Sequence, residues 1–144
     1  MQLYAFNYVS ELKLTYDQNL IATFHYYLPL DFTCQGLETV FPGSSLWLAT
    51  IWAGTDREKA EIVRNFDYVA EWSKLHQNIR ILLGEFGAYS RAPQDSRIRW
   101  TTMVREQAER HGFAWSYWEF GSSFGVYDPA AETWRPDLLK ALIP

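Results

Sequence analysis

The chain has 144 residues, which is the length of one domain and is enough to bury a sizeable core. Its 13 basic and 17 acidic residues give a net charge of −4, and no basic cluster interleaves with the aromatic residues, so nucleic acid is excluded as an expected partner. No apolar run is long enough to span a membrane, and the first residues lack the basic and apolar regions of a secretion signal.

Three short segments predict strands. Residues 19–25 form a β-rich run that we expect to be buried on both faces of a parallel sheet. Residues 79–83 and 113–118 have the same character and predict two further strands. Residues 2–6 would add a fourth strand if they pair with the sheet, so we expect three to four strands.

Helices are predicted after each of these three strands. Thr55 and Glu58 have the spacing of a capping box and predict a helix that runs to about Leu75. A second helix is expected to begin near Pro93 or Asp95 and to end at residues 111–112, where a glycine can take the left-handed cap. A last helix is expected over residues 136–142, with a proline in its first turn.

The alternation of strands and helices predicts an α/β fold with parallel strands and right-handed crossovers. Apolar residues recur at helical spacing and predict the core faces of the first two helices, which comprise Ile62, Phe66 and Val69, and Trp100, Val104 and Ala108. The loops that follow strands are long, whereas those that follow helices are short. In such folds ligands bind at the carboxyl ends of the strands, where His25, Glu85, Trp118 and Glu119 are expected to lie.

Glu85 is the main catalytic candidate, because it ends an apolar strand pattern and stands between two glycines. A carboxylate buried there without a function would cost several kcal/mol unless it were hydrogen-bonded. The structural alternative is an acid that caps the helix near Pro93 or pairs with Arg91. His25 could be a satisfied core histidine, and Trp118 could pack under the sheet edge. Trp118 could instead offer an indole face to a sugar.

Two other classes of site are excluded. Residues 121–125 match the Gly-x-Ser-x-Gly pattern of serine hydrolases, but an extended stretch and a turn follow where that motif needs a helix. The three histidines fall on different predicted elements without metal-ligand spacing, so no metal site is expected. Cys34 is the single cysteine, so no disulfide can form within the chain.

Three segments carry a resemblance to a known family. Residues 19–27, residues 84–89 (Gly-Glu-Phe-Gly-Ala-Tyr) and residues 117–121 (Tyr-Trp-Glu-Phe-Gly) resemble consecutive blocks of glycoside hydrolase family 5, the cellulase family. The resemblance implies half of a (β/α)8 TIM barrel, with residues 1–144 forming a single half-barrel domain similar to strands 5–8. It implies a retaining hydrolase of β-1,4-linked glucans that needs no cofactor.

The resemblance also implies roles for individual residues. Glu85 falls on the nucleophile, His25 and Tyr27 on a His-x-Tyr pair that orients the nucleophile or the sugar, and Trp118 on the tryptophan under the reacting sugar. The family's acid/base lies in an Asn-Glu-Pro motif, and this chain contains no such tripeptide. Glu119, or a second copy of Glu85, could replace that acid.

Two further departures, at Cys34 and Thr39, fall where relatives carry a histidine and a sugar-stacking tryptophan. A catalytically weak or inactive glucan-binding half-barrel therefore stays open as the alternative function.

A half-barrel sheet leaves unpaired backbone groups at both edges. We therefore expect a homodimer in which two copies complete one barrel-like core. The expected partners are a β-glucan and a second copy of the chain, with no nucleic acid and no membrane. The cellular location stays open, because relatives are commonly secreted and the chain carries no signal.

Overall fold

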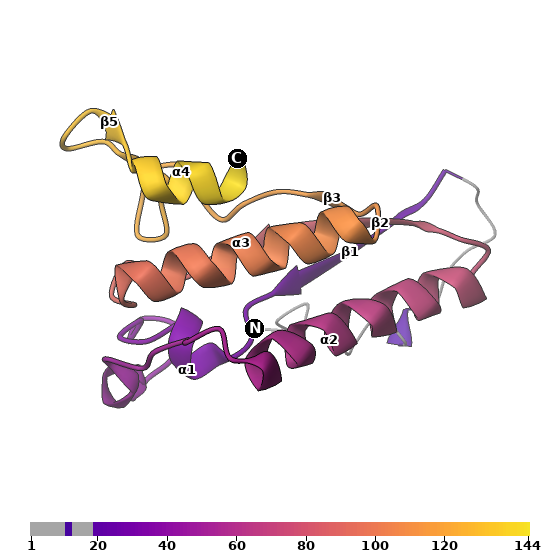
Figure 1. Cartoon of the computed structure of the whole chain (residues 1–144), viewed down its shortest axis with the longest axis horizontal. Helices are drawn as coiled ribbons and strands as arrows, with labels where there is room; N and C mark the ends of the chain where they lie inside the picture. The colour runs from indigo at the N-terminus through magenta and orange to yellow at the C-terminus, as the bar shows by residue number, and fades with distance from the viewer. Residues whose placement is uncertain (1–10, 13–18) are drawn as a thin grey trace.

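The computed structural model describes residues 11–12 and 19–144, and the expected strand at residues 2–6 lies outside them. The described residues form a three-stranded parallel sheet in the order β1 (Ile21–Tyr26), β2 (Arg80–Phe86) and β3 (Ala114–Trp115). Figure 1 shows the long helices α2 and α3 running beside this sheet, with α4 against α3. The predicted α/β fold with parallel strands is confirmed.

The three predicted helices are present as α2, α3 and α4, and two short helices that were not predicted, α1 and η2, lie before them. They are α1 (Leu30–Thr33), the 3-10 helix η2 (Ser44–Trp47), α2 (Asp56–Leu75), α3 (Gln94–Arg110) and α4 (Pro136–Leu142). The loop after β1 holds α1 and η2, and the loop after β3 holds a hairpin of β4 (Tyr127–Asp128) and β5 (Thr133–Trp134). Among the described residues, none of these helices is long and apolar enough to cross a membrane.

The helix ends follow the predicted local chemistry. At the start of α2, the Thr55 hydroxyl accepts a hydrogen bond from the Glu58 N–H, and the Glu58 carboxylate accepts one from the Thr55 N–H at 2.7 Å. After α3, Gly112 takes a φ of 70°, which closes the helix in the left-handed conformation. Both signals were therefore read correctly from the sequence.

The core lies between one face of the sheet and the helices α2 and α3. All six apolar residues predicted to face the core from these helices are buried. Phe24 of β1 packs edge-on against Phe66 of α2 with ring centroids 5.6 Å apart, and Tyr26 stacks on Trp100 of α3 at 6.2 Å. The Trp100 indole also donates a hydrogen bond to the Leu28 carbonyl at 2.9 Å, which ties α3 to the loop after β1.

Two expectations about the strands are wrong. β1 is buried on one face, through Ala22, Phe24 and Tyr26, whereas Ile21 on the other face is 55% exposed. The reason is that the helices of the described chain cover a single side of the sheet. The strand expected over residues 113–118 is also shorter, because only residues 114 and 115 pair as β3 before the chain becomes a loop.

Candidate active site

A bulge in β2 sets the position of Glu85. β1 and β2 pair Phe24 with Leu83 and then His25 with Glu85, so Gly84 is an extra residue in β2. A Cβ on Gly84 would lie 2.6 Å from the Thr23 hydroxyl and 3.1 Å from Nε2 of His25. Only glycine fits there, and the bulge brings the Glu85 carboxylate beside His25.

Two side chains hold the Glu85 carboxylate. The Tyr27 hydroxyl donates a hydrogen bond to Oε2 of Glu85 at 3.0 Å, and Nδ1 of His25 lies 3.2 Å from the same oxygen. The side chains of His25 and Glu85 are 22% and 30% exposed, so they lie at the surface of the uncovered face of the sheet. The three residues predicted for the catalytic centre are therefore in contact.

The structural alternatives for these residues are not found. The N-cap of α3 is Pro93 and no side chain caps this helix, and within the described part of the chain Glu85 pairs with His25 rather than with Arg91. His25 lies on the side of β1 opposite Phe24 and Tyr26, so it is not a core histidine.

Tyr27 is suited to act as a permanent hydrogen-bond donor. Burial raises the pKa of its phenol, and the negative charge of Glu85 and the hydrogen bond to Glu85 raise the pKa further. Deprotonation would place two negative charges side by side, so the hydroxyl keeps its proton over the neutral pH range. The Thr33 hydroxyl donates to the Tyr27 carbonyl and fixes the backbone at this position.

The loop after β3 carries Trp118 and Glu119 to the same end of the sheet. The backbone N–H of Trp118 donates a hydrogen bond to the Phe86 carbonyl at 2.9 Å, and the residue is 43% exposed. A Cβ on Gly87 would lie 2.1 Å from the Trp118 carbonyl oxygen, so the glycine after Glu85 permits this close approach. The peptide bond between Trp118 and Glu119 is cis.

Glu119 does not join the contacts around Glu85. Its carboxylate accepts hydrogen bonds from the Ser122 hydroxyl and, at 3.5 Å, from the Phe124 N–H, so it is bound within its own loop. The neighbouring Gly-x-Ser-x-Gly segment is followed by β4 and not by a helix, which agrees with its exclusion as a nucleophile motif.

Cys34 and Thr39 are the two departures from the family pattern, and Cys34 lies close enough to Tyr27 to add to the raised pKa of that phenol. Cys34 is buried, its sulfur lies 3.6 Å from the Thr33 hydroxyl, and burial raises the pKa of the thiol. Thr39 is exposed in the loop before η2. In the described part of the chain, no group of three or more His, Cys, Asp or Glu could hold a metal ion.

Arg97 is a structural residue of this region that the sequence reasoning missed. It is 7% exposed, and its guanidinium donates from Nε to the Ala88 carbonyl at 3.0 Å and from Nη2 to the Phe124 carbonyl at 3.1 Å. It therefore ties the loop after Glu85 to the loop after Trp118. Arg97 falls on the same helical face as Trp100 and Val104, and a charge on that apolar face could have revealed it.

Comparison with known proteins gives consistent matches. A family model described as cellulase (glycosyl hydrolase family 5) matches residues 6–123. Endoglucanase H of Acetivibrio thermocellus is 33% identical, and the match covers 96% of this chain and 14% of that protein.

Solved structures give the same picture. An endoglucanase has a TM-score of 0.93 at 42% identity, with 97% of this chain and 44% of that one covered. Cel5A of Thermotoga maritima in complex with cellobiose has a TM-score of 0.91 at 41% identity, with 96% and 44% covered. The cellulose synthase subunit Z of Clostridioides difficile has a TM-score of 0.91 at 40% identity, with 98% and 46% covered. The chain thus spans less than half the length of each of these relatives and matches part of their barrel.

Proposed function

The chain belongs to glycosyl hydrolase family 5, the cellulase family, and on this basis we propose that it supplies the nucleophile side of a site that hydrolyses β-1,4-linked glucans. The observation that carries the proposal is the contact of Oε2 of Glu85 with the Tyr27 hydroxyl and with Nδ1 of His25. In this proposal residues 1–144 act as one half-barrel domain, and the substrate is a glucan oligosaccharide or polysaccharide.

Glu85 acts as the nucleophile of a retaining mechanism. Its carboxylate attacks the anomeric carbon and forms a covalent glycosyl-enzyme intermediate, which water then hydrolyses. The Tyr27 hydroxyl and the His25 ring orient the carboxylate, because both contact the same oxygen and leave the other one for attack. Tyr27 performs this role without changing its own charge, since the pKa of its phenol is raised.

Trp118 provides the platform for the sugar. The apolar face of a pyranose stacks on an exposed aromatic ring, and the half-exposed indole of Trp118 follows the strand next to Glu85. Glu119, the next residue, contributes to substrate binding from the same loop, where the Ser122 hydroxyl donates a hydrogen bond to its carboxylate.

The family's usual motif for the general acid, Asn-Glu-Pro, is absent from this sequence. Retention requires a second carboxylate roughly 5 Å from the nucleophile. Glu119 already accepts hydrogen bonds within its own loop, which disfavours it as that acid. A second copy of the chain could bring another Glu85 to the site, where like charges would raise one of the two carboxyl pKa values.

A homodimer is therefore part of the proposal. The described residues leave one face of the sheet uncovered, and the chain spans about 44% of the length of a structural relative, so two copies approach the length of one barrel. The partner in this assembly is a second copy of the same half-barrel.

The alternative function is glucan binding with little or no hydrolysis. The missing Asn-Glu-Pro tripeptide favours it, since loss of general acid catalysis costs about 10²–10⁴-fold in rate. In that case Trp118 binds the glucan, and Glu85 acts only on substrates whose leaving group needs no protonation.

The test measures reducing-sugar release from soluble carboxymethyl cellulose by the purified chain and by Glu85→Gln. Activity that disappears in the variant supports the hydrolase. Turnover of activated aryl glycosides alone, again lost in Glu85→Gln, identifies a nucleophile without its acid. Saturable binding of cello-oligosaccharides by both proteins without turnover supports the binding module, and Trp118→Ala should then abolish binding.

A further inference from the structure

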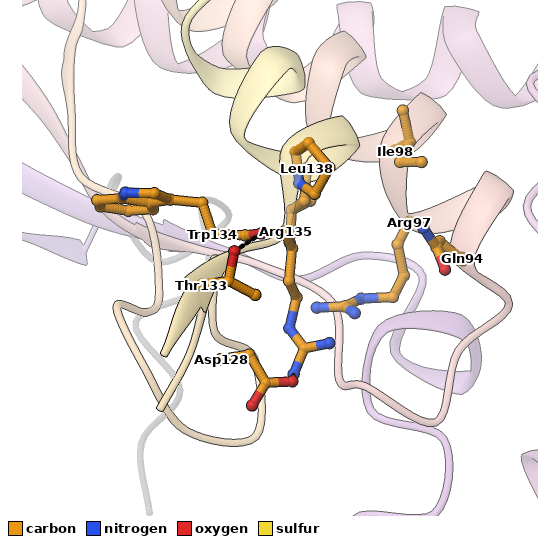
Figure 2. Close-up of a pocket in the computed structure, with 9 residues that line it drawn as sticks. Gln94, Arg97, Ile98, Asp128, Thr133, Trp134, Arg135 and Leu138 are labelled. Carbon is orange, nitrogen blue, oxygen red and sulfur yellow. Dashed lines mark hydrogen bonds and ion pairs between the residues drawn. The ribbon is translucent and has the colours of Figure 1, made fainter. Parts of the chain in front are cut away.

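A pocket of about 260 Å³ lies between the β4–β5 hairpin, α3 and α4, and none of its lining residues belongs to the candidate active site. Figure 2 shows the guanidinium groups of Arg97 and Arg135 directed into the same space, with Asp128 beside them. Gln94, the first residue of α3, and Thr133 add polar groups, whereas Ile98, Pro136 and Leu138 provide apolar walls.

The charges that line this pocket do not cancel. It contains two arginines and one aspartate, which leaves a charge of +1 in a chain whose net charge is −4. Burial lowers the pKa of Arg97, the neighbouring Tyr117 hydroxyl opposes this shift, and the positive charge of Arg135 adds to it. The two guanidinium groups are therefore close enough to repel each other.

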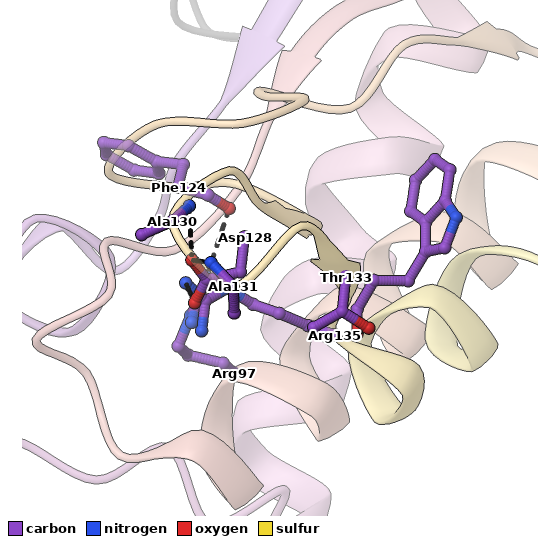
Figure 3. Close-up of polar contacts among 8 residues, drawn as sticks. Arg97, Phe124, Asp128, Ala130, Ala131, Thr133 and Arg135 are labelled. Carbon is purple, nitrogen blue, oxygen red and sulfur yellow. Dashed lines mark hydrogen bonds and ion pairs between the residues drawn. The ribbon is translucent and has the colours of Figure 1, made fainter.

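Asp128 can neutralise only one of the two arginines. Its Oδ2 accepts a hydrogen bond from Nη2 of Arg135 at 2.8 Å, while its Oδ1 accepts from the backbone N–H groups of Ala130 and Ala131 at 3.2 and 3.3 Å. Figure 3 shows this group of contacts at the turn of the hairpin. Asp128 is thus occupied by the hairpin turn and by Arg135.

Backbone carbonyls surround the buried guanidinium of Arg97. The guanidinium donates to the neutral carbonyls of Ala88 and Phe124, and the Tyr117 hydroxyl lies beside it. Among the described residues, no carboxylate forms an ion pair with Arg97. A buried guanidinium without a counter-charge is most stable when an anion approaches it.

We propose that this pocket binds a small oxyanion, a carboxylate or phosphate group, between Arg97 and Arg135. A guanidinium presents its N–H groups in a planar fork that matches the oxygens of such anions. The N-terminus of the 17-residue helix α3, which has no side-chain cap, adds favourable electrostatics at Gln94. The volume is below the roughly 300–1,000 Å³ of drug-sized ligand sites, so the ligand is a single acidic group or an acidic monosaccharide.

The test is a calorimetric titration of the full chain with inorganic phosphate, glucuronate and glucose at constant ionic strength. Phosphate or glucuronate should bind, and glucose should not, because recognition depends on the negative charge. Binding of glucuronate alone assigns a sugar acid, and binding of phosphate alone assigns a phosphate ester. This outcome is independent of the proposed hydrolase, because Glu85→Gln should bind the same anions unchanged.

Two variants are expected to change anion binding in opposite directions. Arg135→Gln should weaken binding at least about 10-fold, because a hydrogen bond to a charged group contributes about 1.5 kcal/mol or more. Asp128→Asn should strengthen binding, since it removes the competing carboxylate and keeps an oxygen for the hairpin turn. The exposed Arg57→Gln on α2 is the matched control for the loss of one positive charge and should have no effect.

Two results would overturn the proposal. One is the absence of binding by both acidic probes, with circular dichroism confirming that the chain is folded. The other is anion binding that is equally strong in Arg135→Gln and unchanged in Asp128→Asn, which would assign the pocket to an adventitious ion only.

Discussion

At the residue scale, the candidate site depends on close approaches that only glycine permits. Gly84 forms the bulge that aligns Glu85 with His25, and Gly87 allows the Trp118 carbonyl to approach the strand. Each glycine flanks Glu85, so the two positions determine where the carboxylate and the indole lie. The sequence pattern around Glu85 is thus a packing requirement as well as a chemical one.

Gly84→Ala should destabilise the fold by about 1–3 kcal/mol, the usual cost of inserting a methyl group into an occupied space. The new Cβ would lie 2.6 Å from the hydroxyl of Thr23, a stiff β-branched residue. Urea denaturation followed by circular dichroism measures the change. Gly121→Ala is the control, because the nearest heavy atom to its Cβ is 4.0 Å away. Equal stability of the two variants would contradict the bulge.

Alkaline pH should destabilise the protein through its buried tyrosines. Burial raises the pKa of Tyr26, Tyr27 and Tyr117 above the value of about 10 for a free phenol. Because the folded state holds these protons more tightly, their stabilising effect is complete below pH 10 and is lost as the pH rises towards the folded pKa values.

The measurement is the free energy of unfolding in urea between pH 8 and pH 12. Each buried tyrosine should add up to about 1.4 kcal/mol per pH unit to the fall above pH 10. Tyr27→Phe should make this fall less steep. Phenolate absorbance from Tyr27 near pH 9 in a folded chain would refute the expectation.

At the scale of elements, side chains within a few residues determine where the helices begin and end, whereas contacts between distant residues fix the loops. The capping box of α2 forms as its spacing predicts. Partial burial alone would raise the pKa of Glu58, but hydrogen bonds from the Thr55 side chain and from backbone N–H groups outweigh it and lower that pKa. The loop after β3 behaves differently, because Arg97 on α3 holds it through the Phe124 carbonyl.

Thr55→Ala should cost about 1 kcal/mol of stability, which is typical for the loss of an N-cap side chain. The variant loses the hydroxyl that accepts from the Glu58 N–H. Chemical denaturation compares it with Lys59→Ala, an exposed substitution in the first turns of α2 that should change stability by less than about 0.5 kcal/mol. A loss of the same size in both variants would exclude the capping box as its cause.

Arg97→Met should destabilise the chain by about 1–3 kcal/mol, because it leaves the buried Ala88 carbonyl without its donor, whereas the Phe124 carbonyl keeps the hydrogen bond from the Tyr117 hydroxyl. Thermal unfolding reports this loss. Arg110→Met, at the end of the same helix and exposed, is the matched control. A stable Arg97→Met variant with unchanged Trp118 fluorescence would show that the two loops do not depend on this arginine.

At the scale of the whole molecule, the described residues cover the sheet on one side. The buried residues of β1 face α2 and α3, while Ile21 is exposed on the opposite face. In the proposed homodimer the second copy of the chain would cover this face. In the structural relatives the matched region is about 44% of a chain, so the same face has further residues available to cover it there.

The homodimer proposal predicts about twice the mass of one chain by sedimentation equilibrium at micromolar concentration. Ile21→Lys should shift the equilibrium to monomers, because it places a charge on the uncovered face. Leu75→Lys, at the exposed end of α2, should leave the dimer intact and serves as the control. A monomeric mass for the unmodified chain would rule out self-completion of the barrel.

The sequence alone predicted the elements with periodic or local signals. The faces of α2 and α3, the capping box at Thr55 and the end of α3 at Gly112 all depend on residues within a few positions of each other. The sequence also predicted that Glu85, His25 and Tyr27 lie together, from the strand ends and from the resemblance to the family, and the three are in contact.

Only the tertiary structure decided the remaining features, because they depend on contacts between segments that are far apart in the sequence. The register that makes Gly84 a bulge, the single covered face of β1, the short β3 and the loop contacts of Arg97 all join residues many positions apart. A residue pattern records which side chains are apolar or charged. Which of them meet follows from the packing of helices on the sheet, which no local pattern contains.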